Sequence, residues 1–465
     1  MKTFLALGLG LAAVSSPRAT IFFDREADPF PFVDLTVILP VGSDVDVRKD
    51  VGLKQMLPDI LEGGTAKLSR ADFFDRIAEF GATYDVSVTN EFSFVKISYP
   101  IVPKKKMDGL VALLSEAWKT PRFDDETYKI ARTKLEASIR SSLDSDQTLA
   151  TSSARRFLSK NVLGTLPLFI EDLGHLDLSR TQSVYETEFL GVPNVWAGFI
   201  GPESEVDNVK KLLTAMFSKQ GSIQDGPHLE RLRAPKALAK KPKTYKKILI
   251  VDKADRSQTY TAFIGARPSL LSPQEELPFL FSHHIMVFSG LNSVWGEVLR
   301  TKGGFSYAVM SPGYYQLGFP VMGVVSNPIR EKTADALRAI ANTAKAAYDT
   351  GKVYANLSAS EWGHRERSFR YGEILDRSSS SGRLSKRISV LTGALSPELY
   401  ARDPATWKID PKEVEKLISG IWKESSRVLS VVGKAADLRG PVSKAFPGYD
   451  IQVVPFQQVI SEKSY

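Results

Sequence analysis

The sequence predicts an α+β fold of two homologous domains, each a mixed, mainly antiparallel sheet covered by helices. Three observations support this prediction. The chain has 465 residues, too many for one compact core. Alternating apolar runs, typical of strands, follow segments with helical spacing. The order of helix, glycine turn and hairpin also occurs once in each half. We expect a linker to join the domains into one half of a clamshell.

The N-terminus has the order of a secretory signal. Lys2 precedes an apolar run from Phe4 to Val14, and small residues follow up to Ala19. We therefore expect a signal peptide at residues 1–19 and an exported protein, most simply in a bacterial periplasm. The run is too short for a membrane anchor, and no later segment resembles one. The alternative is an apolar first strand.

Residues 20–219 are expected to form the N-terminal domain. Residues 73–80 have helical spacing, Gly81 follows, and two alternating runs at 84–88 and 92–99 predict a hairpin. A helix is then expected to begin at Pro103. A longer amphipathic helix is expected over residues 124–143, with one apolar face made by Tyr128, Ala131, Leu135 and Ile139.

Residues 248–465 repeat the pattern. Residues 291–299 have helical spacing, a Gly-Gly pair follows, and strands are expected at 307–310 and 315–325. The next helix is expected to begin at Pro328. Near the end of each half, the strand segments 197–201 and 429–433 also match. We infer two related domains.

Residues 220–247 are rich in charge, glycine and proline, and we interpret them as an interdomain linker. The formal net charge of +8 is a small excess for this length. The lysines of the linker are interleaved with one aromatic residue, Tyr245, and match no recognition module, so no nucleic-acid partner is expected. The lysines are Lys236, Lys240, Lys241, Lys243, Lys246 and Lys247.

The absence of cysteine excludes disulfides, thiol nucleophiles and cysteine-ligated metals. The five histidines form no His-x-x-x-His pair on a helix, so a histidine-based metal site is not expected. They are His175, His228, His283, His284 and His364.

The segments 41–46 and 52–65 resemble the opening of the insulinase/pitrilysin zinc peptidases. In that family a helix carries the inverted zinc motif His-x-x-Glu-His and ends in Gly-Thr. The three corresponding positions here are Gln55, Pro58 and Asp59. A glutamine is a poor zinc ligand, a proline cannot act as a base, and one aspartate cannot hold the metal alone. We therefore expect no catalytic residue and no metal on this chain.

Two further positions complete the comparison with that motif. Glu136 matches a later family ligand, and without the histidine pair we interpret it as a relic of that position or as a charge on the helix face. Lys54 stands where the family usually has a small residue, so we expect the helix there to face solvent or an acidic neighbour.

The segment 299–309 resembles the family's Arg and Tyr pair, here Arg300 and Tyr307. The resemblance implies that these residues bind substrate at the zinc of the opposite domain, Arg300 through a peptide carbonyl and Tyr307 through a carbonyl or oxyanion. The alternatives without a functional role are a surface charge at a helix end for Arg300 and a half-buried strand aromatic for Tyr307. A serine nucleophile elbow at Ser306 and a phosphate loop are disfavoured, because here a helix leads into a strand.

The resemblance implies a non-catalytic, substrate-binding subunit of an exported zinc metallopeptidase heterodimer, similar to the inactive chains of bacterial heterodimeric peptidases and mitochondrial processing peptidase. The expected partners are a zinc-bearing insulinase-like subunit of similar size and extended, unfolded peptides held as an added strand. No cofactor is expected on this chain, and zinc is expected on the partner. The alternative is a peptide-binding or scaffold homodimer without hydrolytic activity.

Overall fold

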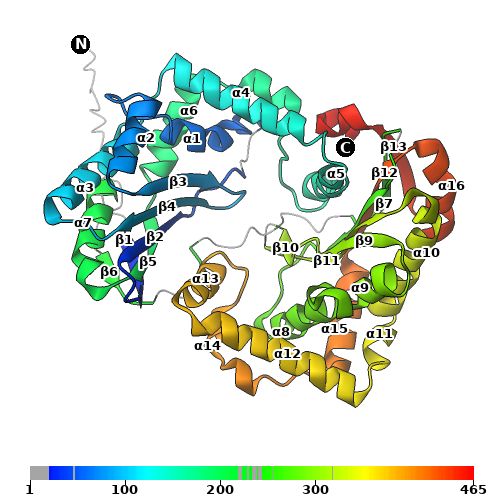
Figure 1. The fold of residues 1–465 in the computed structure, drawn as a ribbon. Helices are drawn as coiled ribbons and strands as arrows, with labels where there is room; N and C mark the ends of the chain where they lie inside the picture. The colour runs from blue at the N-terminus through cyan, green and yellow to red at the C-terminus, as the bar shows by residue number, and fades with distance from the viewer. Residues whose placement is uncertain are drawn as a thin grey trace, which may run out of the picture.

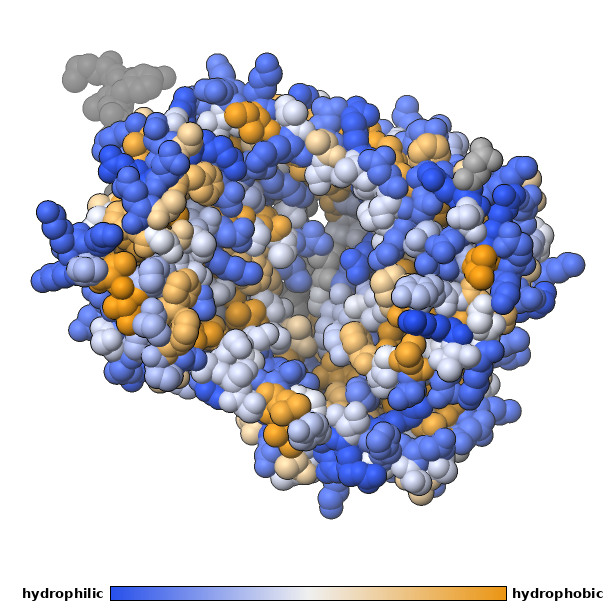
Figure 2. Space-filling view, in the orientation of Figure 1, coloured by the Kyte–Doolittle hydropathy of each residue, from blue (hydrophilic) through white to orange (hydrophobic). Residues whose placement is uncertain are grey.

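We analysed a computed structural model of the chain. It describes residues 20–44, 48–217, 223–227, 230–232, 238, 243–254, 256–316 and 318–465, so the predicted signal peptide lies outside the described residues. Two helix-covered sheets form the two halves of the molecule (Figure 1). Figure 2 shows a hollow between the halves. The predicted α+β class is confirmed.

The N-terminal sheet has six strands in the order β3-β4-β2-β5-β1-β6. β1 runs parallel to β5 and β6, and the other pairs are antiparallel. The strand bounds are β1 Thr20–Ala27, β2 Phe32–Leu39, β3 Thr83–Val88, β4 Ser93–Pro100, β5 Asn194–Gly201 and β6 Ile223–Asp225.

β6 lies inside the segment predicted as a linker. It adds three residues to the edge of the sheet through main-chain pairing with β1. Such a short edge strand buries few side chains, and the alternating pattern that marks longer strands is absent from it. The sequence therefore offered no signal for it.

Helices cover the outer face of this sheet and build the larger core of the N-terminal half. The bounds are α1 Leu53–Leu61, α2 Arg70–Glu79, α3 Lys104–Lys119, α4 Asp125–Ser141, α5 Asp146–Asn161, α6 Leu178–Val184 and α7 Val206–Phe217, with short turns η1 Arg48–Asp50, η2 Ile170–His175, η3 Tyr185–Phe189 and η4 Glu203–Glu205.

The C-terminal sheet repeats this topology, with the order β10-β11-β8-β12-β7-β13 and β9 also paired to β11. β12 lies between the parallel β7 and the antiparallel β8, as β5 lies between β1 and β2. The bounds are β7 Lys246–Asp252, β8 Tyr260–Ala266, β9 Ser306–Met310, β10 Tyr315–Gln316, β11 Phe319–Pro328, β12 Ser426–Gly433 and β13 Asp450–Pro455.

Two local predictions for this half were wrong. The strand predicted at 315–325 is divided between β10 and β11, because a tight turn with a positive φ of 76° at Gly318 reverses the chain. Pro328 does not begin a helix: it ends β11, and the turn at Arg330–Lys332 precedes the helix that begins at Thr333.

The helices of the C-terminal half are α8 Pro273–His283, α9 Val294–Gly296, α10 Thr333–Ala344, α11 Lys352–Ala355, α12 Ala359–Ser378, α13 Ser380–Leu391, α14 Pro397–Ala401, α15 Pro411–Glu424 and α16 Ala435–Ala445. The shorter turns are η5 His284–Phe288, η6 Gly290–Asn292, η7 Glu297–Thr301, η8 Arg330–Lys332, η9 Lys345–Asp349, η10 Pro404–Thr406, η11 Phe456–Ile460 and η12 Glu462–Ser464. The helix predicted at 291–299 is present as three short pieces, η6, α9 and η7. None of the described helices combines the length and apolar character needed to cross a bilayer.

One helix from each half packs against the sheet of the other half. α5, which follows the long helix α4, packs on the inner face of the C-terminal sheet through residues such as Leu149 and Leu158. α13, which follows α12, packs on the inner face of the N-terminal sheet through Leu384 and Leu391. Figure 1 shows both helices toward the middle of the molecule. The predicted apolar face of α4 is confirmed, since Ala131 and Ile139 are buried.

Buried ion pairs attach α13 to β1. Arg383 Nε lies 2.7 Å from Glu26 Oε2, and Arg387 bridges Glu26 Oε1 at 2.7 Å and Asp24 Oδ1 at 2.5 Å. Asp24 is only 2% exposed, and its Oδ2 has no hydrogen-bond partner among the described residues. Burial outweighs the attraction of Arg387 and raises the pKa of Asp24 to about 6.

Asp24 should make stability depend on pH. Its folded pKa of about 6 lies above its ordinary value of 3.8, so the folded state binds the proton more tightly. Ionisation above about pH 6 therefore costs stability, and this cost is relieved as the pH falls from 7 toward 5. Between these pH values the wild type should gain on the order of 1 kcal/mol of unfolding free energy relative to Asp24→Asn.

Urea unfolding at both pH values measures this difference. Asp207→Asn, at an exposed aspartate of α7, is the matched control and should keep the pH dependence of the wild type. An identical pH dependence in wild type and Asp24→Asn would contradict the assignment.

Candidate functional site

The degenerate motif lies on α1, which begins after Gly52, a residue with φ of 100°. The helix buries Leu53, Met56, Leu57, Ile60 and Leu61. The three motif positions are only partly buried and lie off that apolar face. Pro58 lies inside the helix and donates no backbone hydrogen bond. The motif positions are thus accessible, but their chemistry differs from that of a zinc helix.

A lysine neutralises the one carboxylate left in the motif. Lys134 Nζ on α4 donates a short hydrogen bond to Asp59 Oδ1. Glu136 does not contribute to this pair, because its Oε1 lies 2.8 Å from Arg140 on the same helix. Gln55 Oε1 is buried without a hydrogen-bond partner among the described residues.

These side chains do not fit zinc. The only strong metal ligand among the three motif side chains, the Asp59 carboxylate, is already paired with the Lys134 ammonium group, and Gln55 offers a neutral amide oxygen. Within the described part of the chain, no three His, Cys, Asp or Glu side chains lie together as a metal-binding group. That the protein binds no zinc stays a prediction.

Lys54 also has an acidic partner. It is 6% exposed, and its Nζ lies 2.6 Å from Glu188 Oε2 of η3. Of the two environments expected for Lys54, solvent or an acidic neighbour, the structure shows the second. A buried lysine of this kind needs such a partner, since an isolated charge is costly to bury.

Arg300 and Tyr307 lie together at the junction of η7 and β9. The turn between them is closed by the Gly304 amide, which donates to Arg300 O at 3.0 Å, and by the Phe305 amide, which donates to Leu299 O at 2.9 Å. Gly304 has a positive φ of 58°. The Arg300 guanidinium carbon lies 4.6 Å from the centre of the Tyr307 ring. The sequence-predicted pair is therefore adjacent in space.

This pair is open to a ligand. Tyr307 is 74% exposed, although it belongs to a strand. Among the described residues we find no ion pair or side-chain hydrogen bond for the Arg300 guanidinium; its neighbour there is the Tyr307 ring. Stacking orients the planar guanidinium while its N–H donors stay available. The arrangement suits a carbonyl or carboxylate ligand that receives donors from both residues.

Asn327 holds the start of β9 in place, a role that the sequence did not reveal. Its Oδ1 accepts hydrogen bonds from the Ala308 amide at 2.7 Å and from Ser306 Oγ at 2.9 Å. Ser306 is thus buried and bonded at the start of a strand that follows a helical turn, which is unlike a nucleophile elbow. The only sequence signal was a polar residue within the apolar run of β11.

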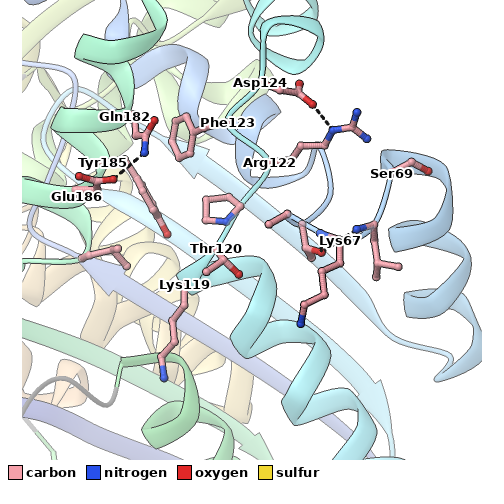
Figure 3. A pocket seen from close by; sticks show the side chains of 15 residues that line it. Lys67, Ser69, Lys119, Thr120, Arg122, Phe123, Asp124, Gln182, Tyr185 and Glu186 are labelled. Atoms are coloured by element: carbon pink, nitrogen blue, oxygen red, sulfur yellow. Dashed lines mark hydrogen bonds and ion pairs between the residues drawn. The ribbon is translucent and has the colours of Figure 1, made fainter.

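A separate surface hollow of about 650 Å³ lies on the N-terminal half, between the start of α2, the segment after α3, and α6 with η3 (Figure 3). Several polar side chains that line the hollow already have partners within the chain: Arg122 pairs with Asp124, Gln182 with Glu186, and Thr65 with Glu116. It contains none of the sequence-predicted site residues. We therefore base the functional argument on Arg300 and Tyr307.

Comparison with known proteins relates the chain to solved structures only. No family model matches the sequence, and no curated protein matches it. A Pseudomonas fluorescens structure described as a peptidase M16 inactive domain is 14% identical, with a TM-score of 0.68 over 89% of this chain and 95% of that one.

Two further structures are similar to the same degree. A Helicobacter pylori protease is 14% identical, with a TM-score of 0.66 over 88% of this chain and 96% of that one. A conserved protein from Enterococcus faecalis V583 is 14% identical, with a TM-score of 0.65 over 90% and 98%. At this identity the likeness establishes a shared fold over nearly the whole described chain.

The contact between Lys134 and Asp59 predicts how the helix would respond to a restored motif. Gln55→His, Pro58→Glu and Asp59→His together recreate His-x-x-Glu-His. We expect weak zinc binding by this triple variant, because the Lys134 ammonium remains beside position 59 and repels the metal. Adding Lys134→Ala should raise zinc affinity at least about tenfold.

Competition with a chromogenic chelator measures both affinities. Lys129→Ala, at an exposed lysine on the same helix, is the matched control. If Lys129→Ala raised zinc affinity as much as Lys134→Ala, the local role of Lys134 would be refuted.

Proposed function

We propose that this chain is a non-catalytic, substrate-binding subunit that acts with a zinc-bearing peptidase chain of the same fold. The observation that carries the proposal is the contact between the Arg300 guanidinium and the exposed Tyr307 ring, with no ion pair for the arginine among the described residues. The side chains at the motif positions of α1 do not fit a metal. In this proposal Arg300 and Tyr307 supply substrate binding, and the partner chain supplies the metal that the α1 side chains do not fit.

The pair suits a peptide main chain held at a partner's zinc. The Arg300 guanidinium would donate a hydrogen bond to the oxygen of the peptide carbonyl under attack. The Tyr307 hydroxyl would donate a second hydrogen bond to the same oxygen. As that oxygen gains negative charge, both hydrogen bonds strengthen, which favours the transition state over the bound substrate. The zinc of the partner would supply the activated water.

An extended peptide also has a main-chain edge to pair with beside Tyr307. In the described residues β9 pairs only with β11, so its other edge is open. At the corresponding edge strand of the N-terminal half, the Val86 amide of β3 donates to Glu62 Oε1 at 3.0 Å. This hydrogen bond competes with the addition of a peptide strand to β3. The edge of β9 is therefore the favoured place for the peptide to pair.

The similar structures support the proposal through their descriptions. The Pseudomonas fluorescens protein is described as an inactive domain, and the Helicobacter pylori protein as a protease. The proposal includes the finer parts of the sequence prediction: export through residues 1–19, domains at 20–219 and 248–465, a heterodimer, and unfolded peptides as substrate. A homodimer that binds peptides without cutting them is the alternative outcome.

Substitutions at the pair test the proposal. The chain is co-expressed and co-purified with a zinc-bearing chain of the same fold, and hydrolysis of an unstructured fluorogenic peptide is measured. Arg300→Ala and Tyr307→Phe should each lower kcat/KM about 10- to 100-fold, because each removes a donor to the reacting carbonyl. Size-exclusion chromatography should show the complex intact.

Arg439→Ala and Tyr371→Phe are matched controls at exposed positions and should leave kcat/KM unchanged. Full activity in Arg300→Ala and Tyr307→Phe would refute the proposal. A self-associating chain that retains peptides and never cleaves them would support the homodimer instead.

A further inference from the structure

Two loops meet at one end of the N-terminal sheet and expose apolar side chains. The β1–β2 loop carries Phe30, which is 68% exposed, and the segment after β4 carries Ile101, which is 41% exposed. The loops are joined by the Ile101 amide, which donates to Pro31 O at 3.2 Å. The two exposed side chains therefore belong to one surface.

Phe30 is held in its outward position. It lies between Pro29 and Pro31, whose rings restrict the backbone, and its amide donates to Asp28 Oδ1 at 3.0 Å. A constrained loop cannot easily fold an aromatic ring back onto the protein. Since water contact with so much apolar surface is unfavourable, this exposure calls for a ligand or partner.

Three consecutive lysines lie beside this apolar surface. Lys104, Lys105 and Lys106 form the first turn of α3, at the outer edge of the N-terminal half in Figure 1. All three are exposed, and none has an ion pair among the described residues. Ile101 precedes Lys104 by three residues, so the Lys104 backbone lies within about 11 Å of it, and Lys105 and Lys106 follow in the same helical turn.

This placement of charge is unfavourable for the helix itself. The amino end of a helix carries a partial positive charge, so three cations there are destabilising. The first turn of α3 has no acidic residue, and Asp108, one turn on, is paired with Lys211 at 2.6 Å. Asp28 of the β1–β2 loop caps the Phe30 amide. The charge of the three lysines is therefore left for an external anion.

We propose that this basic apolar tip, made of Phe30, Ile101 and Lys104 to Lys106, docks the protein reversibly on an anionic lipid surface. Phe30 and Ile101 enter the interface between headgroups and acyl chains, while the lysines pair with phosphates around them. The flexible lysine side chains suit many mobile phosphates better than one fixed partner.

Vesicle co-sedimentation with the full chain tests whether the charge of the three lysines contributes to lipid binding. The protein should bind vesicles of phosphatidylglycerol and phosphatidylcholine, bind poorly to phosphatidylcholine alone, and be released by high salt. Lys104→Glu, Lys105→Glu and Lys106→Glu together should lower the partition coefficient at least about tenfold. Lys412→Glu, Lys416→Glu and Lys423→Glu, at exposed positions of α15, change the net charge equally and should have a much smaller effect.

A tryptophan placed at the tip tests insertion. All six native tryptophans are buried, so the Phe30→Trp variant adds the exposed indole. Its added fluorescence should shift to the blue and resist acrylamide quenching when anionic vesicles are present. Equal loss of binding in both lysine triples, or an indole at position 30 that stays quenchable on vesicles, would overturn the proposal. Salt-sensitive binding to an acidic protein but not to vesicles would also overturn it.

Discussion

The exchange of helices α5 and α13 between the two halves is the constraint on which the rest of the structure depends. Without α13, Trp196 and Ile38 on the inner face of the N-terminal sheet would lose their apolar cover. The C-terminal sheet depends on α5 in the same way. Buried apolar faces of this size need a packed layer on each side. Each half therefore completes its core only with a helix from the other half.

Ion pairs reinforce this exchange in both halves of the molecule. Arg383 and Arg387 of α13 reach the carboxylates of β1. At the start of α5, Asp146 Oδ1 forms an ion pair with Lys253 Nζ at 2.8 Å, and the Lys253 side chain is only 6% exposed. Since breaking one partner of a buried pair leaves an uncompensated charge, these contacts specify one arrangement of the two halves. The relative position of the two sheets, and with it the hollow between them, follows from the exchange more than from the covalent connection.

The repeat could be read from the sequence because it is carried by local signals. Glycine turns at Gly81 and Gly304 precede edge strands in both halves, and amphipathic spacing marks α4. The exchange could not be read in this way. Arg387 and Asp24 look like surface charges in the sequence, and their contact joins positions 363 residues apart. For the same reason Arg300 and Tyr307 were found together, while Lys134, 75 residues from Asp59, was missed.

The contact of Lys134 with Asp59 also explains what balances the charge of the carboxylate on α1. A carboxylate near the surface of α1 needs a positive neighbour, and in a metal site the ion fills that need. Lys134 supplies the charge from α4 and so links the two helices. An ammonium group, however, has no open coordination position for water and cannot act as a Lewis acid. The ion pair between α4 and α1 can therefore persist without any hydrolytic chemistry, and the peptide binding proposed for Arg300 and Tyr307 needs no metal on their own chain.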